Sequence, residues 1–198
     1  MDQPNQKERI ILGIDPGTAV MGYGLIKEIG PRIELISMGV VKMDKIDDHM
    51  LKLQRIFEKT VALIDNYHPD CLAIEAPFYG KNIQVMLKLG RAQGVAMAAA
   101  LSRNVTITEY APRKIKQSIT GNGNATKEQV AAMVQTLLKF KETPDFLDAT
   151  DGLAVAVCHS FQRVATGKSS ISKKSYSGWD TFVKDNTNRV EGLSKTKK

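Results

Sequence analysis

The alternation of apolar and polar residues predicts five strands. Short apolar or alternating runs bounded by turn signals such as Pro16-Gly17 are typical of strands. The first three runs follow one another through short turns, and the last two are separated by long helical patterns. The fourth run is wholly apolar, as expected for a strand of a parallel sheet that is covered on both faces. The predicted strands cover residues 9–15, 20–26, 32–43, 71–75 and 105–110.

Apolar residues at helical spacing predict five helices. Asp47 or Asp48 caps the first helix, and Pro112 suits the first turn of the third. Thr126 and Gln129 resemble a capping box at the start of the fourth. In the second, glycines at 90 and 94 and several alanines make one face slim, which permits close packing. The helices are expected from about 48 to 67, 82 to 103, 112 to 121, 126 onward, and 144 to 164.

The order of these elements predicts the fold class. Three strands, a helix, a strand, a helix, a strand and then helices indicate an α/β sandwich with a five-stranded mixed sheet. The first three strands should be antiparallel, and crossovers should add the other two. We expect one folded domain over residues 9–165, an N-terminal extension over 1–8 and a disordered tail over 166–198. Trp179 and Phe182 offer the alternative of a small docking element in that tail.

Composition excludes several classes of protein. No apolar run approaches the roughly 20 residues that span a membrane, and the polar start of the chain does not resemble a signal peptide. The chain has 198 residues and two cysteines, Cys71 and Cys158, both in apolar patterns. These read as buried thiols in a reducing compartment, so we expect a cytoplasmic protein without a membrane partner.

The positive charge is unevenly distributed. The net charge is +7, of which the tail from residue 166 onward carries +5. Such asymmetry favours a polyanionic partner such as nucleic acid, although a solubilising surface explains the charge equally well. Residues 80–116 contain one acidic residue, Glu109, and seven basic ones, which are Lys81, Lys88, Arg91, Arg103, Arg113, Lys114 and Lys116.

Four carboxylates carry the candidate chemistry. Asp15 and Glu75 each end an apolar strand pattern, and Asp148 and Asp151 open the last helix. A carboxylate in an apolar setting is costly unless something compensates its charge, and a divalent metal ion compensates well. Strands 9–15 and 71–75 can lie side by side with the last helix across them. The four acids would then form an oxygen-rich site suited to magnesium and phosphoryl chemistry.

Three of the four acids also have a purely structural explanation. Asp15 before Pro16-Gly17 could simply start a turn, and acids in the first turn of a helix are favoured by its dipole. Glu75 is harder to explain in that way. Other chemistries lack support, because residues 121–127 do not have the spacing of a Walker A loop. His49, His68 and His159 show no zinc spacing, and nothing indicates a Ser-His-Asp or Cys-His site.

Five separate blocks of the sequence resemble the RuvC-type Holliday junction resolvases of bacteria. They agree in residue and spacing and occur in the same order over about residues 9–165. The blocks are ILGIDPGTAVMGYG (11–24), AIEAPF (73–78), KLGRAQG (88–94), EYAPRKIK (109–116) and DATDGLA (148–154).

The resemblance implies a ribonuclease H-like fold, a homodimer and magnesium-dependent nicking of two strands of like polarity at a four-way DNA junction. It implies two Mg²⁺ ions, for which Mn²⁺ should substitute, and the RuvA-RuvB branch-migration complex as a partner. Some relatives have His where this chain has Asp148. The family's acidic positions fall on Asp15, Glu75, Asp148 and Asp151, and its DNA contacts on Phe78, Lys116 and Lys127, with Arg113 in the same basic block.

Three rival functions remain at this stage. Asp15-Pro-Gly-Thr18 also resembles the phosphate loop of actin-like sugar and acetate kinases, but those need two such domains and a second phosphate loop. A non-catalytic junction-binding module would have no need of all four acids. A related nuclease could act on another substrate, such as an RNA/DNA hybrid. A metal-dependent nicking assay on a four-way junction and on a hybrid separates the three.

Overall fold

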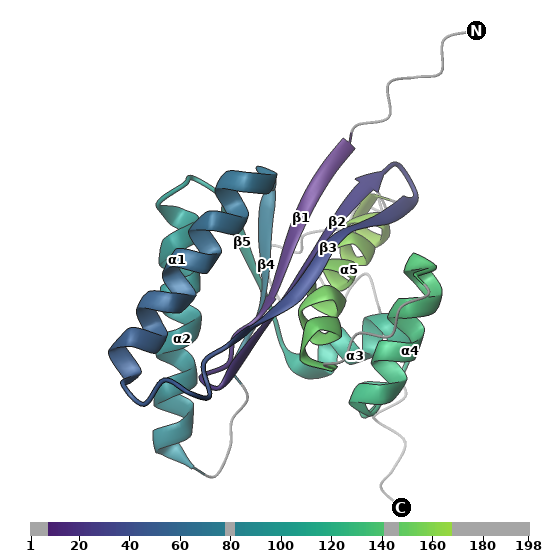
Figure 1. Ribbon diagram of the computed structural model, residues 1–198. Helices are drawn as coiled ribbons and strands as arrows, with labels where there is room; N and C mark the ends of the chain where they lie inside the picture. The colour runs from purple at the N-terminus through teal and green to yellow at the C-terminus, as the bar shows by residue number, and fades with distance from the viewer. Residues whose placement is uncertain (1–7, 78–81, 141–146, 168–198) are drawn as a thin grey trace, which may run out of the picture. The chain divides into compact units, whose positions relative to one another are not determined.

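A five-stranded mixed sheet organises the chain (Figure 1). The structure is a computed structural model that describes residues 8–77, 82–140 and 147–167. The sheet order is β3-β2-β1-β4-β5; β1–β2 and β2–β3 pair antiparallel, and β1–β4 and β4–β5 pair parallel. The predicted sheet is thereby confirmed. Its strands are β1 (Glu8–Asp15), β2 (Val20–Ile29), β3 (Arg32–Lys42), β4 (Cys71–Glu75) and β5 (Thr106–Tyr110).

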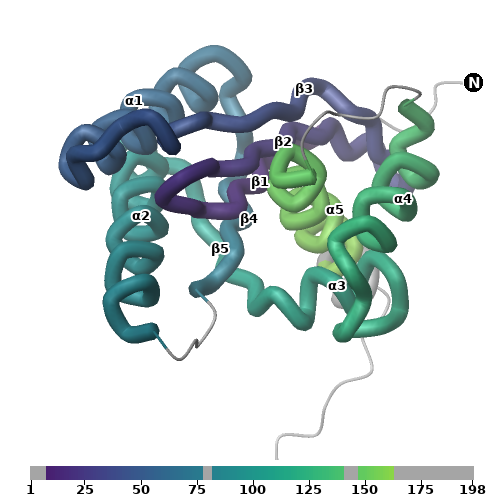
Figure 2. Tube along the Cα trace, turned by 60° about the horizontal axis from the view of Figure 1, so that its bottom comes forward, coloured from purple at the N-terminus to yellow at the C-terminus, as the bar shows by residue number. Residues whose placement is uncertain are grey.

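Helices cover both faces of the sheet. In Figures 1 and 2, α1 and α2 lie against one face, and α5 lies against the other with α3 and α4 beside it. The helices are α1 (His49–Tyr67), α2 (Ile83–Leu101), α3 (Pro112–Thr120), α4 (Lys127–Leu138) and α5 (Leu147–Gly167). None of the helices in the described ranges is long and apolar enough to cross a bilayer.

The helix ends form where the sequence signals them. The Asp48 side chain accepts a hydrogen bond from the Met50 amide at 2.7 Å and caps α1. Pro112 occupies the first turn of α3. At α4 the capping box is complete: the Gln129 amide donates to the Thr126 hydroxyl at 3.3 Å, and the Thr126 amide donates to the Gln129 side chain at 3.0 Å. These bonds satisfy amide groups that a helix start leaves without a partner.

Two elements extend three residues beyond their predicted ends, and the other described bounds lie within two residues of the prediction. β2 continues to Ile29, three residues beyond the predicted end at 26, because Lys27 and Glu28 still pair with Ile10 and Arg9 of β1. α5 ends at Gly167 instead of 164. The predicted start of that helix at 144–145, the extension before residue 8 and the tail beyond 167 lie outside the described residues, so these bounds stay predictions.

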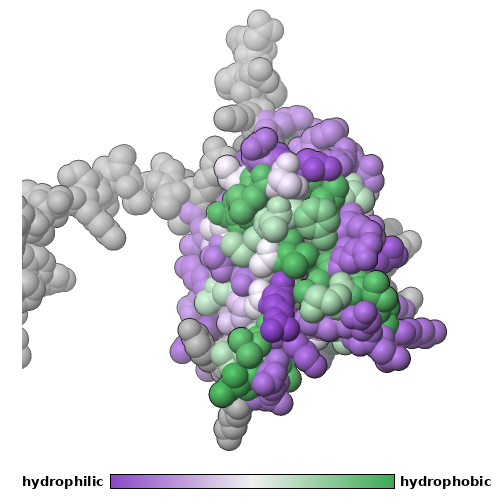
Figure 3. Space-filling view, turned by 90° about the vertical axis from the view of Figure 1, so that its left-hand side faces the viewer, coloured by the Kyte–Doolittle hydropathy of each residue, from purple (hydrophilic) through white to green (hydrophobic). Residues whose placement is uncertain are grey.

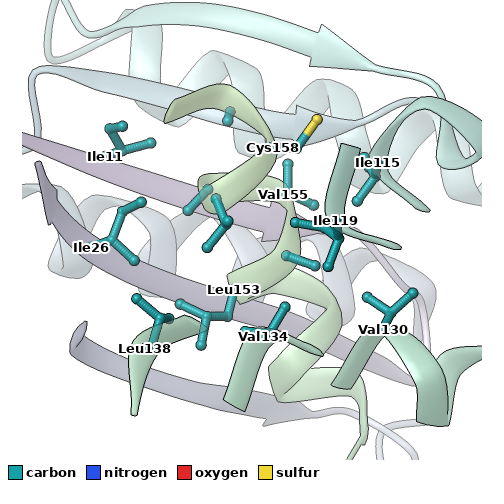
Figure 4. Close-up of a cluster of buried hydrophobic side chains, with 14 of the residues drawn as sticks. Ile11, Ile26, Ile115, Ile119, Val130, Val134, Leu138, Leu153, Val155 and Cys158 are labelled. Carbon is teal, nitrogen blue, oxygen red and sulfur yellow. The ribbon is translucent and has the colours of Figure 1, made fainter. Parts of the chain in front are cut away.

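Two hydrophobic cores lie on opposite faces of the sheet. Leu12, Ile14 and Ile74 face α1 and α2, whose buried residues include Ile56 and Ala96. The other core joins the sheet to α3, α4 and α5. Each fully buried aliphatic side chain contributes roughly 1.5–3 kcal/mol. Figure 4 shows this second core, in which the labelled residues are Ile11, Ile26, Ile115, Ile119, Val130, Val134, Leu138, Leu153, Val155 and Cys158.

Glycines let the backbone of α5 rest directly on β1 and β2. A Cβ atom added at Gly22 would collide with the carbonyl oxygen of Asp148, and one at Gly24 with the Cα atom of Leu153. A Cβ atom at Gly152 would lie 2.6 Å from the Cα atom of Tyr23. No other residue type fits these contacts without displacing the helix. We call Gly13, Gly22, Gly24 and Gly152 the glycine seat of α5.

A polar cluster holds α5 further along its length. The Tyr110 hydroxyl lies 2.9 Å from Nδ1 of His159, whose Nε2 lies 3.1 Å from the Arg9 guanidinium. Arg9 also donates to the sulfur of Cys71 at 3.0 Å. Both cysteines are buried free thiols, as predicted. Burial raises the pKa of Cys71 to about 11, so this thiol stays protonated at neutral pH.

The buried alanines and the glycines of α2 lie on different faces of the helix. Its alanines Ala92, Ala96 and Ala100 do pack into the core. Gly90 and Gly94 do not: within the described ranges, a Cβ atom at either position would meet no atom within 4 Å. The described part of the chain itself therefore does not pack against these two glycines.

Candidate active site

Two of the predicted acids lie at the ends of neighbouring parallel strands. Asp15 ends β1 and Glu75 ends β4, and the pairing of Ile14 with Ile74 places the two strand ends side by side. In open α/β sheets, ligands bind beyond the carboxyl ends of parallel strands. The location therefore suits a binding site.

The other two acids come from the first turns of α5. Asp148 and Asp151 are one helical turn apart and share a face of the helix. The glycine seat brings this part of α5 onto β1 and β2, because Gly22 meets the backbone of Asp148 itself. The close packing of α5 on the glycines of the sheet thus places the carboxylates of Asp148 and Asp151 near the end of β1, although the two segments are far apart in the sequence.

One cavity of about 230 Å³ contains most of the predicted site. Asp15, Glu75 and Asp151 line it, and two of the predicted DNA-contacting lysines line it with them. The fourth acid, Asp148, does not line the cavity, but it binds one of those lysines. The complete lining is Asp15, Glu75, Pro112, Ile115, Lys116, Lys127, Val130, Asp151 and Ala154.

Lys127 is ion-paired with both acids of α5. Its ammonium group lies 2.6 Å from the carboxylate of Asp151 and 3.2 Å from that of Asp148. Lys127 is the first residue of α4, directly after the capping residue Thr126. Burial lowers the pKa of Lys127, but its hydrogen bonds and ion pairs with the two acids outweigh burial and raise that pKa overall. Sequence reasoning assigned Lys127 to DNA and missed this contact.

The cavity raises the pKa values of the carboxylates that line it, because it disfavours their charged forms. Burial, followed by repulsion from Asp151, raises the pKa of Asp15 to about 7. Burial and then Asp15 raise the pKa of Glu75 to about 8. Burial also raises the pKa of Asp151, although Lys127 opposes this. The acids repel one another, and a further cation in the cavity would stabilise their charged forms.

The residues fit a hard divalent metal ion by their donor chemistry. All four acids offer carboxylate oxygens, which are the ligands that Mg²⁺ prefers. In the described ranges no set of three or more His, Cys, Asp or Glu side chains is arranged to hold a metal ion. Two of the four carboxylates bind the ammonium group of Lys127 instead.

Gln93 supports the site from the opposite face of the sheet. This buried residue of α2 donates to the Glu109 carboxylate at 2.8 Å and to the backbone carbonyl of Glu75 at 3.4 Å. It thereby ties the end of β4 to β5 and α2. Sequence reasoning gave Gln93 no role. The available signal was an amide next to Ala92 and at helical spacing from Ala96 and Ala100, on the face of α2 that is buried.

Two further residues, Phe78 and Arg113, are predicted to contact DNA. Phe78 lies outside the described residues. Arg113 lies in the first turn of α3, is exposed and does not line the cavity. Its side chain passes close to Gly123, where an added Cβ atom would lie 2.6 Å from the Arg113 Cγ atom.

Comparisons with known proteins agree on one family. The family described as Crossover junction endodeoxyribonuclease RuvC matches residues 11–159. A protein of this description from Christiangramia forsetii is 61% identical over 185 residues, covering 93% of this chain and 94% of that one. One from Bacteroides fragilis is 58% identical over 187 residues, covering 93% and 97% of the two chains.

Solved structures support the same conclusion. Thermus thermophilus RuvC in complex with a Holliday junction substrate is similar with a TM-score of 0.74 and 30% identity, covering 80% of this chain and 96% of that one. The yeast mitochondrial Holliday junction resolvase Ydc2 is similar with a TM-score of 0.58 at 12% identity, covering 82% and 84% of the two chains, and this likeness concerns the fold alone. The fold is the ribonuclease H-like fold of RuvC, as predicted.

Proposed function

Because the chain belongs to the RuvC family of crossover junction endodeoxyribonucleases, we propose that the cavity at the ends of β1 and β4 is its active site. The chain is a metal-dependent nuclease that resolves Holliday junctions. One observation carries the assignment of the site: acids from β1, β4 and α5 meet two lysines in a single cavity. Acids for a metal and cations for a phosphate are the two requirements of phosphodiester hydrolysis.

The proposed metal ligands are Asp15, Glu75, Asp148 and Asp151, which would hold two Mg²⁺ ions, with Mn²⁺ as a substitute. When bound, such ions lower the pKa of water and stabilise the charge that develops on the phosphate and the leaving oxygen. The chain's contribution is to hold the carboxylates in fixed places. Asp15 and Glu75 are fixed by the pairing of β1 with β4, and the α5 pair is fixed by the glycine seat.

The proposed DNA contacts lie around this cavity. Lys116 and Lys127 line it and would neutralise phosphate charge next to the acids. The start of α4 favours an anion because its amide groups point outward. Arg113, one turn from Lys116 on α3, would bind the backbone further away. Phe78 follows β4 in the sequence and would stack on an unpaired base at the junction centre.

A homodimer would explain symmetric nicking of two strands. The outer face of α2 presents one stripe at helical spacing, formed by Ile83, Leu87, Gly90, Gly94, Ala98 and Leu101. Ile83, Leu87 and Leu101 are 69%, 52% and 62% exposed, and the two glycines face open space in the described part of the chain. Figure 3 shows apolar side chains gathered on this side of the molecule, over α1 and α2. A second copy could approach closely here, and an isologous contact would pair two identical sites.

Further parts of the proposal concern the setting of the reaction. We assign residues 9–165 to the nuclease domain and the basic tail beyond 165 to non-specific DNA affinity. The RuvA-RuvB complex would be the partner that moves the junction, and chromosomal DNA as substrate places the reaction in the cytoplasm. Among the rival functions, family membership argues against the kinases. The RNA/DNA hybrid remains the substrate to test beside the junction.

The test is cleavage by Asp15→Asn on a mobile four-way junction. The variant should lose nicking, because one charged ligand is gone. It should keep junction binding in the absence of metal, because a negative charge near the phosphate has been removed. Asp44→Asn, an exposed acid after β3, is the matched control and should cleave like the parent. Near-normal cleavage by Asp15→Asn would refute the site, and faster cleavage of a hybrid than of the junction would refute the substrate.

A further inference from the structure

Lys127 already neutralises the acid pair of α5. Its ammonium group contacts Asp151 at 2.6 Å and Asp148 at 3.2 Å, and the Asp151 side chain is only 15% exposed. Lys116 lines the same cavity, and its charge opposes the rise in pKa of Glu75 and Asp151. Among the described residues, however, the ion pairs of Asp148 and Asp151 are both with Lys127. The two lysines of the cavity therefore differ in what they bind.

We propose that Lys127 is an internal counter-ion that competes with the divalent metal for Asp148 and Asp151, and that metal binding releases it toward the DNA phosphate. This inference rests on the proposed function, since it takes these acids as metal ligands. It adds a regulatory contact that a lysine acting only on DNA would not have.

Charge makes the competition unavoidable. The ammonium group and the metal ion would share the same two carboxylates, and two cations in contact repel each other strongly in a partly buried site. With Lys127 in place, the α5 pair has lost much of its negative potential, which weakens its attraction for a second cation.

The side chain can change partner without a change in the fold. Lys127 is 51% exposed, so its ammonium group can reach solvent by rotation of the side chain. Its backbone is held by the capping box of Thr126 and Gln129. The released lysine therefore stays at the helix start, beside the cavity, where amide groups also favour an anion.

Metal and DNA are then coupled through one residue. A phosphate that binds Lys127 removes the competitor of the metal, and a metal that binds the acids frees Lys127 for the phosphate. Such coupling is reciprocal by linkage. The expected consequence is a site that binds metal weakly until DNA arrives.

The test is Mn²⁺ binding by calorimetry without DNA. Lys127→Gln should bind Mn²⁺ about tenfold more tightly than the parent, which corresponds to about 1.4 kcal/mol. Lys116→Gln is the matched control and should change the affinity much less. Lys127→Arg keeps the charge and should stay close to the parent. Unchanged or weaker binding by Lys127→Gln would overturn the proposal, as would equal gains in Lys116→Gln or Lys127→Arg.

Two further measurements keep the outcome interpretable. Asp151→Asn should weaken Mn²⁺ binding; if it does not, the proposed metal site fails, independently of Lys127. Without metal, Lys127→Gln should melt at a lower temperature than the parent, because it exposes the repulsion between the acids. Mn²⁺ should raise that melting temperature more than it raises the parent's. A smaller rise would count against competition even if the variant is less stable.

Discussion

Glycine has opposite roles on the two faces of this sheet. On the α5 face, the glycine seat has no space left, because backbone atoms of α5 lie where Gly13, Gly22 and Gly24 lack side chains, and backbone atoms of β2 lie where Gly152 lacks one. On the α2 face, Gly90 and Gly94 open onto empty space within the described part of the chain. The first face is completed inside one chain, and it carries the acids. The second is the face at which we propose that another copy of the chain binds. Glycine thus permits a close packing contact within the chain on the first face and, as proposed, a contact between two copies on the second.

The largest expected effect tests this contrast directly. Gly22→Ala should destabilise the protein by about 3–5 kcal/mol, because its Cβ atom would collide with the Asp148 carbonyl group and overpacking of this kind displaces backbone. Cleavage should be lost with it. Gly90→Ala should be neutral, or more stable by about 0.5–1 kcal/mol, since alanine favours helices. Urea unfolding at matched protein concentration measures both. Equal effects at the two positions would remove the contrast.

The second prediction concerns pH. The pKa of Asp15 is raised to about 7, so between about pH 4 and pH 7 the folded protein holds a proton that the unfolded chain has lost, and stability falls as pH rises. Without metal, Asp15→Asn should therefore gain stability relative to the parent across this range, by about 4 kcal/mol at pH 8. Mg²⁺ should reduce the gain by stabilising the parent. Chemical unfolding at several pH values checks this.

Asp65 on α1 should behave with the opposite sign. Its hydrogen bond with the exposed Arg103 lowers its pKa. Its contribution to stability is therefore present above its usual pKa and is lost as the pH falls. Asp65→Asn should be less stable than the parent at neutral pH, and the difference should vanish in acid. If both substitutions changed the stability in the same direction at neutral pH, the two positions would not differ electrostatically.

The third prediction tests the outer face of α2, where Gly90 and Gly94 lie. Gly94→Arg should weaken self-association at least about tenfold, because a long charged side chain would enter the proposed contact. The monomer should stay folded, since there is space around this residue. Sedimentation velocity measures the association and circular dichroism the fold. Ala132→Arg, at an exposed position of α4, is the control. Unchanged association in Gly94→Arg would place the contact elsewhere.

The smallest effect probes the residue that links the two faces. Gln93→Met should destabilise by about 1–2 kcal/mol, because buried hydrogen bonds to Glu109 and to the carbonyl of Glu75 are lost. We expect a lower kcat with little change in KM, since Glu75 loses its support but the DNA contacts remain. Gln54→Met removes an exposed bond within α1 and should alter neither. A change confined to KM would argue against positioning of Glu75.

The sequence was sufficient for the order of elements and for the meeting of Asp15 with Glu75, because apolar runs and turn signals are local. It could not predict the longer β2, since Glu28 is a charged residue that is buried only because neighbouring strands pair with it. The contacts of Lys127 and Gln93 were also missed. Both depend on how helices cross the sheet, and that crossing is set by tertiary packing at the glycine seat. The contribution of Phe78 stays a prediction.

The double attachment of α5 has a consequence for how such chains can diverge. The glycine seat fixes the helix near Asp148, and Tyr110 meets it again at His159, three turns later. Two attachment points fix both the rotation and the axial position of a helix. The positions of the acids on α5 then follow from these two attachments. A single residue added between Gly152 and His159 would turn the two attachments out of phase by about 100°.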